Sequence, residues 1–281
     1  MLIRLVARGL LSASVALILV APPGLFAQVS VTAKVNPTDG AEMVLVPAGE
    51  FAMGTDASEI PIAARRLFSD APKHIVNLSE YWIYKNDVTV AQYKAFCKAT
   101  GHEMPPFPQY TWQGDDHPIV NVNWSDASAY AAWAGVSLPT EAEWEKAARG
   151  TDGRAYPWGN EWDPGLCAHW ETTFVLGDLG TNMSVGSYPL GASPYGALDM
   201  AGNVWQWCAD WYDPNYYKAT PSINPTGPEN GSCRVLRGGA WDDVGTYIFR
   251  AAHRNYRFPS SIDVNDTDGF RCAATSAQSM N

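Results

Sequence analysis

The stretch from Thr151 to Asn230 constrains the fold more than any other part of this chain. It consists mostly of Gly, Pro, Asn, Asp and aromatic residues, which is typical of turns and loops. The whole chain carries 24 Gly and 20 Pro together with 12 Trp and 13 Tyr, so we expect many turns held in place by aromatic rings. These features favour an α+β fold with low regular secondary structure.

Three helices are predicted outside that stretch, each between a capping residue and a glycine. The first has Thr89 as its N-cap, and the strongest has a T-x-x-E capping box formed by Thr140 and Glu143. The three segments are 89–101, 125–135 and 140–150. Short strands are expected in MVLVPAGEFAMG, HIVNLSEYWIYKN, RVLRGGAW and DGFRCA.

Residues 1–27 have the features of a secretory signal peptide. Arg4 and Arg8 are its only charges, an apolar run from Leu10 to Ala21 follows, and Ala27 is a small residue at the expected cleavage site. An uncleaved membrane anchor is the alternative, but the apolar run is short for a spanning helix. We therefore expect a periplasmic or secreted protein, with a short N-terminal segment at 28–40 and one domain at 41–275.

Charge and cysteine content exclude several functional classes. The formal net charge is −10; removing Arg4 and Arg8 leaves 17 Lys+Arg against 29 Asp+Glu, or about −12. This balance argues against nucleic acid and against an anionic membrane as partner, and it is compatible with cation binding. The five cysteines have no zinc-like spacing, and hydrolase or nucleotide-binding motifs are absent from the sequence.

Eight motifs occur together in one order: MVLVPAGEFAMGT, YKNDVTVAQYKAF, HPIVNVNWSDASAYAAWAG, LPTEAEWEKAARG, YPWGN, YGALDMAGNVWQWCADWY, RVLRGGAW and DGFRCA. This set resembles the formylglycine-generating enzyme (sulfatase-modifying factor) family. The resemblance implies a formylglycine-generating-enzyme fold with a C-type-lectin-like core. That family also contains a pyoverdine-maturing oxidative enzyme, sulfoxide synthases and accessory proteins, so membership fixes the fold better than the function.

The resemblance also points to a missing feature. In formylglycine generators, two cysteines between the Gly-Gly and the terminal GFRC bind copper(I), for which soft thiolate ligands are suited. Here Trp241 and Thr246 occupy those positions, and the loop is about two residues shorter. The resemblance therefore implies that copper is not bound at the family site and that the standard cysteine oxidation is lost.

Seven residues near the Gly-Gly form a candidate pocket, whose catalytic role, if any, the sequence leaves open. They are Trp241, Asp242, Asp243, Thr246, Arg250, His253 and Arg254. A histidine can serve as a base or ligand near neutral pH, and the arginines can grip a carboxylate. Equally, Asp242 and Asp243 can be a solvated and a turn-capping residue, the arginines can form structural ion pairs, and Trp241 can fill the former copper cavity.

The resemblance further implies a structural calcium site, which hard oxygen ligands suit. Its side-chain ligands would be Asp199 and Gln206, and its carbonyl ligands Gly202 and Val204. The plain alternative is that Asp199 and Asn203 are turn residues.

Three functions follow as hypotheses. The first is an exported accessory or maturation factor that binds a protein segment or small molecule without standard cysteine-to-formylglycine oxidation. The second is an oxidoreductase of different mechanism, like the pyoverdine-maturing relative. The third is a C-type-lectin-like recognition module.

Overall fold

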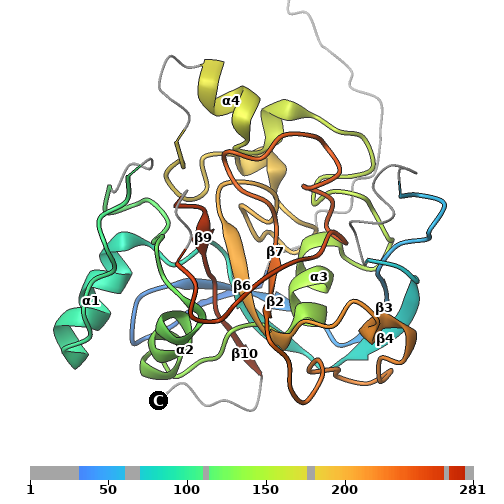
Figure 1. Cartoon of the computed structure of the whole chain (residues 1–281), viewed down its shortest axis with the longest axis horizontal. Coiled ribbons are helices and arrows are strands. Elements are labelled where there is room, and N and C mark those ends of the chain that lie inside the picture. Colours follow the sequence, from blue (N-terminus) through green and yellow to red (C-terminus); the bar gives the residue numbers. More distant parts are fainter. Residues whose placement is uncertain (1–31, 61–69, 110–113, 176–180, 263–265, 276–281) are drawn as a thin grey trace, which may run out of the picture.

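The computed structural model describes residues 32–60, 70–109, 114–175, 181–262 and 266–275. Its strands form three small sheets, and short helices lie around them (Figure 1). The helices are α1 (Val90–Thr100), α2 (Trp124–Trp133), α3 (Glu141–Arg149) and α4 (Trp170–Val175), with 3-10 turns at Pro164–Leu166, Pro189–Gly191 and Tyr216–Lys218. Short elements joined by long loops confirm the predicted α+β class with little regular structure.

The first sheet joins the two ends of the described chain. Its order is β1 (Ala33–Val35), β2 (Glu42–Val46), β5 (Tyr81–Tyr84) and β10 (Ala273–Thr275). All three pairings are antiparallel, and Ala273 in β10 lies opposite Ile83 in β5. A second, two-stranded sheet pairs β3 (Gly49–Met53) with β4 (His74–Leu78).

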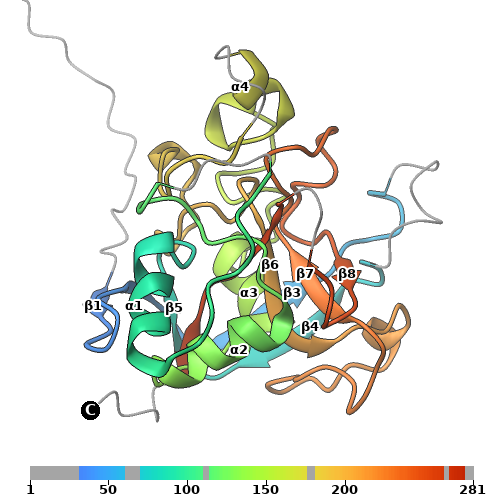
Figure 2. The same cartoon turned by 60° about the vertical axis from the view of Figure 1, so that its left-hand side comes forward.

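The third sheet carries the segment that leads into the candidate pocket. Its order is β8 (Asn255–Arg257), β7 (Arg234–Arg237), β6 (Trp205–Trp211) and β9 (Asp268–Gly269). Strand β6 is antiparallel to β7 and parallel to β9, and it lies centrally in the molecule beside α3 (Figures 1 and 2).

The helix ends confirm the capping predictions closely. Thr89 caps α1 and Gly101 ends it in the left-handed conformation, while Thr140 and Glu143 form the predicted box at α3. Helix α2 begins one residue earlier than expected, because Asn123 is its N-cap. Local hydrogen-bonding chemistry therefore sets these boundaries.

The stretch 151–230, predicted to be mostly loop, contains two regular elements that the sequence did not indicate. Strand β6 lies inside this stretch, and so does the short helix α4. In β6, Trp205, Gln206 and Trp207 are all buried, since Gln206 packs against α3 and the two tryptophans pack in the cluster around α1 and α2 on the other face. When both faces of a strand are buried, its sequence lacks the alternation of apolar and polar residues by which a strand is usually recognised.

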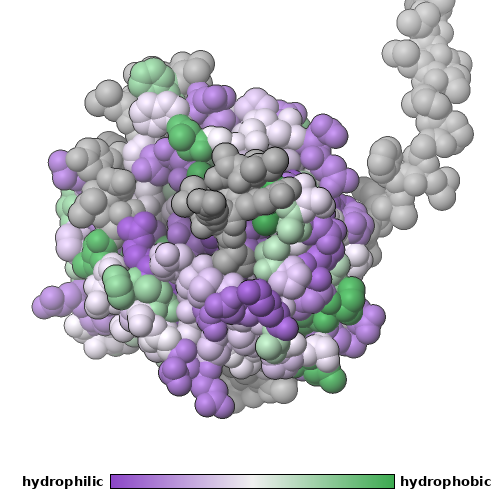
Figure 3. Space-filling view, turned by 45° about the vertical axis from the view of Figure 1, so that its right-hand side comes forward, coloured by the Kyte–Doolittle hydropathy of each residue, from purple (hydrophilic) through white to green (hydrophobic). Residues whose placement is uncertain are grey.

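Two large hydrophobic clusters and one small cluster form the core. One large cluster lies around α1, α2 and Trp207, and the other around β2–β5 and Trp144 of α3. The small one contains Tyr156 and Phe249, with Trp158 and Trp162 against it. On the face drawn in Figure 3, apolar side chains occur as separate patches among hydrophilic ones.

Candidate functional site

A double glycine starts the loop in which the sequence places the candidate pocket. Gly238 and Gly239 have φ values of 103° and 80°, a region that side chains other than glycine rarely adopt. A Cβ atom on Gly239 would also lie 2.8 Å from the ring of Phe249. Glycine is therefore required for the chain to turn here against packed aromatic rings.

Trp241 lies inside the protein rather than on a pocket wall. It is only 5% exposed, its amide donates to the carbonyl of Asn203 at 3.0 Å, and its carbonyl accepts from the hydroxyl of Thr173 at 3.5 Å. Among the described residues, the indole Nε1 has no hydrogen-bond partner. This environment is that of a core side chain, so the structure favours the cavity-filling alternative for Trp241.

Thr246 lies on the surface, in contrast to Trp241. Its carbonyl accepts a hydrogen bond from the Tyr156 hydroxyl at 3.3 Å, and Val244 next to it is 64% exposed. Trp241 is thus buried and Thr246 is open to solvent, and neither supplies a thiolate at the two positions where the family resemblance implies one. These two residues do not fit a copper(I) ion.

The two aspartates after Trp241 belong to a turn. Asp243 accepts the amide of Ala240 on Oδ2 at 2.8 Å, and its carbonyl accepts the amide of Trp170 at 3.4 Å. Asp242 is half-buried. Asp243 is therefore the turn-capping residue of the pair, and it connects the loop to the start of α4.

Arg250 belongs to a partly exposed ion-pair network. Its guanidinium lies 2.7 Å from Glu59, which also pairs with Lys73 at 2.9 Å. Partial burial acts to raise the pKa of Glu59, but hydrogen bonds from Lys73 and Thr55 outweigh it and lower the pKa to about 2. Arg250 is thereby held by a carboxylate that stays ionised.

Arg254 and His253 point into the interior. Arg254 forms a two-pronged ion pair with Glu141 of α3, with distances of 2.7 and 2.8 Å. Burial, assisted by the charge of Arg237, lowers the pKa of His253 to about 3. The sequence left carboxylate binding and structural ion pairing open for Arg254, and its burial against Glu141 favours the structural ion pair.

The seven candidate residues therefore do not line one pocket. Trp241, His253 and Arg254 are buried, Thr246 is exposed, and Asp242, Asp243 and Arg250 are intermediate. The partners that hold them, Glu59, Glu141 and Thr173, are far away in the sequence, and the sequence analysis missed them. The paired carboxylates on α3 were the available signal, since a buried arginine requires one.

A tyrosine and an aspartate beside this loop were also missed. The Tyr247 hydroxyl donates to the buried carboxylate of Asp70, and burial raises the pKa of Asp70 above its usual range. The ring of Tyr247 is 5.5 Å from that of His253. A half-buried phenol held by a carboxylate is a group capable of proton transfer.

An aromatic pair is exposed where α4 meets the loop. Trp170 is 40% exposed and Phe174 is 54% exposed, and their rings stack with centroids 5.2 Å apart. Helix α4 projects from the body of the molecule (Figures 1 and 2). Exposed stacked rings can contact an apolar side chain of a partner.

The predicted calcium residues lie around a dense hydrogen-bond network. The Gln206 oxygen accepts from Trp144 Nε1 at 2.6 Å and from Arg271 Nε at 2.7 Å, and its amide nitrogen donates to the Asp199 carbonyl at 2.7 Å. The Gly202 carbonyl accepts the Val204 amide at 3.1 Å.

In this arrangement the Gln206 oxygen does not suit calcium binding, because it already accepts hydrogen bonds from Trp144 and Arg271. The described residues also contain no group of three or more His, Cys, Asp or Glu side chains suited to a metal ion. Calcium at these residues stays a prediction from the sequence.

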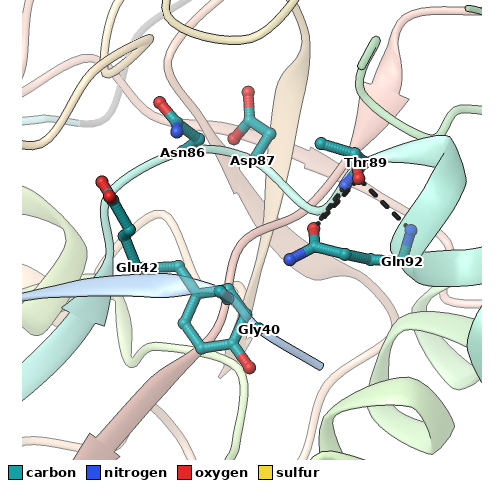
Figure 4. Close-up of a pocket in the computed structure, with 8 residues that line it drawn as sticks. Gly40, Glu42, Asn86, Asp87, Thr89 and Gln92 are labelled. Atoms are coloured by element: carbon teal, nitrogen blue, oxygen red, sulfur yellow. Dashed lines mark hydrogen bonds between the residues drawn. The ribbon is translucent and has the colours of Figure 1, made fainter. Parts of the chain in front are cut away.

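A small polar cavity of about 170 Å³ lies between β2 and the start of α1. Figure 4 shows Asn86 and Asp87 side by side on its rim and Gln92 bonded to Thr89. Asp87 is buried and pairs with Arg271 at 3.0 Å, while its Oδ2 has no partner among the described residues. Burial raises the pKa of Asp87 to about 8.

The expected signal peptide lies outside the described residues. Within the described ranges, no helix is both long and apolar enough to cross a membrane. All five cysteines are free thiols.

Comparison with protein families gives a match over most of the chain. The sulfatase-modifying factor enzyme 1-like domain matches residues 28–276. A formylglycine-generating enzyme of Streptomyces coelicolor is 35% identical, over 85% of this chain and 90% of that protein.

Two other relatives carry different names. Hercynine oxygenase of Mycolicibacterium smegmatis is 33% identical over 77% of this chain, which spans 58% of that protein. The solved structure of PvdO from Pseudomonas aeruginosa superposes with a TM-score of 0.72 at 29% identity, covering 86% of this chain and 97% of that one.

Proposed function

Since this chain belongs to the sulfatase-modifying factor family, we propose that it is an exported accessory or maturation factor. In this role it binds a segment of a partner protein without oxidising a cysteine to formylglycine. The observation that carries the proposal is the pair of positions 241 and 246, where a buried tryptophan and an exposed threonine stand in place of two thiolates.

The exposed aromatic pair supports binding of a peptide beside this loop. Trp170 and Phe174 stack in the open, Val244 is exposed beside them in the loop, and the Trp170–Asp243 hydrogen bond connects the two segments. An extended peptide with an apolar side chain could bury all three. Aromatic residues of this kind carry much of the energy in protein interfaces.

The loss of formylglycine chemistry has a direct test. Purified protein is incubated with copper, oxygen and a sulfatase-type C-x-P-x-R peptide, and the peptide is analysed by mass spectrometry. We expect unmodified cysteine, whereas the Streptomyces coelicolor relative serves as the positive control. Formylglycine in the peptide would overturn the proposal.

The binding role is tested separately, with peptides selected from a random phage-displayed library. Peptides that bind the wild type should lose affinity for a Trp170→Ser, Phe174→Ser double variant by about tenfold or more, as expected for removal of a hot spot. Export is tested with residues 1–30 fused to a reporter that is active only outside the cytoplasm; an inactive fusion would remove that part of the proposal.

A second candidate is an oxidoreductase of different mechanism. The similarity to hercynine oxygenase and the Tyr247–Asp70 pair favour it, because a phenol bonded to a carboxylate can move a proton during an oxidation. Oxygen uptake with candidate thiols, abolished by Tyr247→Phe, would support it. Absence of uptake would leave the binding role as the better proposal.

A further inference from the structure

A second and larger cavity lies away from the loop that contains Trp241. Its volume is about 650 Å³, within the range of pockets that hold small molecules. It lies among the end of β4, the segment before α3, and residues 224–226, and its wall includes Thr275 of β10. Figure 1 shows β10 and α4 at opposite ends of the molecule.

We propose that this cavity binds a small ligand that carries a primary ammonium group on an apolar body. The proposal is independent of the function proposed above, because the lining contains none of the residues 238–254.

The walls of the cavity suit the apolar part of such a ligand. Leu78, Leu138 and Tyr81 line it from the hydrophobic core, and Ala209 and Pro225 complete the surface. Leu78 and Tyr81 are buried members of the cluster around β2–β5, so the wall they form is rigid. An apolar group placed here would lose contact with water at little cost in protein order.

The carboxylate of Glu143 supplies the polar part of the proposed binding site. Glu143 Oε2 accepts the amide of Thr140 at 2.8 Å in the capping box of α3. A carboxylate has about four acceptor sites on its two oxygens, and the Thr140 amide and hydroxyl use at most two of them, so acceptor sites are left for a donor from a ligand. The capping bond fixes the carboxylate in place before any ligand arrives.

The remaining lining groups favour a cation over an anion. The lining contains Glu80 and Glu143 but no Lys, Arg or His. Two hydroxyl donors are already used, since Tyr81 donates to the Glu143 carbonyl at 2.6 Å and Ser137 to the Ala273 carbonyl at 3.3 Å. Burial raises the pKa of Glu143, and a bound ammonium group would lower it again by favouring the ionised carboxylate.

A matched pair of probes tests the charge preference on the full purified chain. Benzylamine and benzyl alcohol have nearly the same shape, and only the amine is cationic at neutral pH. Titration followed by NMR or calorimetry should show benzylamine binding about tenfold more tightly, the difference that a charge-assisted hydrogen bond supplies. Equal affinities, or no saturable binding of either probe, would overturn the proposal.

Three variants locate the site. Glu143→Gln keeps an acceptor for the Thr140 amide, since glutamine serves in a capping box as glutamate does, and it should abolish the preference for the amine. Glu161→Gln, on an exposed glutamate outside the lining, should leave the preference intact. Thr226→Trp should fill the cavity and remove binding of both probes, with melting temperatures confirming that all three variants are folded.

The contradicting result is equally specific. If Glu143→Gln is folded and still prefers benzylamine about tenfold, the ammonium group is not recognised by this carboxylate and the assignment of the site is wrong.

Discussion

At the scale of single residues, Trp241 is a buried packing residue. We expect Trp241→Ala to lower the free energy of unfolding by about 3–5 kcal/mol, because it leaves a large cavity in the interior. Urea titration measures the loss. Trp170→Ala, at an exposed ring in α4, is the matched control and should cost less than about 1 kcal/mol. A stable Trp241→Ala protein with impaired partner binding would instead place this side chain in a working pocket.

The Asp87 carboxyl group predicts a dependence of stability on pH. Burial raises its pKa in the folded protein to about 8, against an opposing contribution from Arg271, whereas the unfolded chain releases this proton near pH 4. The stabilisation is thus fully present below about pH 4 and is lost as the pH rises toward 8.

Chemical denaturation at pH 5 and pH 7.5 measures this effect. The free energy of unfolding of the wild type should fall between these values, and Asp87→Asn should fall less. Other carboxyl groups with raised pKa values, such as Asp70 and Asp199, add to this fall, whereas His253 with its lowered pKa opposes it, so the difference between wild type and Asp87→Asn isolates Asp87. An Asp87→Asn variant with the full wild-type slope would show that Asp87 is ionised throughout this range.

The partners of single residues were the least predictable part of the site from the sequence. The sequence marks Arg250 and Arg254 and leaves ion pairing open, but Glu59 and Glu141 lie 191 and 113 positions away. The paired carboxylates on α3 signal that an arginine could lie nearby, but nothing local in the sequence shows which arginine each glutamate meets. Only the folded chain shows which of them are buried beside a guanidinium group.

At the scale of elements, α3 is attached to the third sheet by buried charges. Glu141 pairs with Arg254, and Glu145 pairs with Arg237 at 2.6 Å and Arg149 at 2.9 Å. Arg254→Ala removes one partner and leaves Glu141 buried. We expect a loss of about 3–5 kcal/mol in the free energy of unfolding.

A second substitution checks this explanation for Arg254. Glu141→Gln combined with Arg254→Met removes both charges, so the double variant should regain much of the stability lost by Arg254→Ala. Additive losses in the double-mutant cycle would show that the two side chains act independently.

Elements defined by local signals were predictable, and elements defined by distant pairing were not. The caps at Thr89, Thr140 and Gly101 set α1 and α3 correctly because their hydrogen bonds lie within a few residues. Strand β6 was missed because its partners β7 and β9 begin at positions 234 and 268. Burial of its tryptophans was expected, but its two faces are covered by α3 and by the cluster around α1 and α2, which the local sequence does not show.

At the scale of the whole molecule, the effect of calcium on the melting temperature tells whether an ion is bound at Asp199 and Gln206. The resemblance predicts an ion at Asp199 and Gln206, whereas the observed hydrogen bonds already satisfy the Gln206 side chain. We expect these bonds to persist, so chelation by EDTA should leave the melting temperature unchanged. A rise of the melting temperature with added calcium, removed by Asp199→Ala, would establish the ion site instead.

The position of the last strands has a consequence for biogenesis. Strand β10 pairs with β5, β9 pairs with β6, and Arg271 between them bonds to the carbonyls of Tyr84, Lys85 and Leu198. Two of the three sheets are therefore incomplete until residue 275 has left the ribosome. The chain therefore cannot complete these two sheets during most of its synthesis, because the last strands must pair with strands made far earlier in the chain.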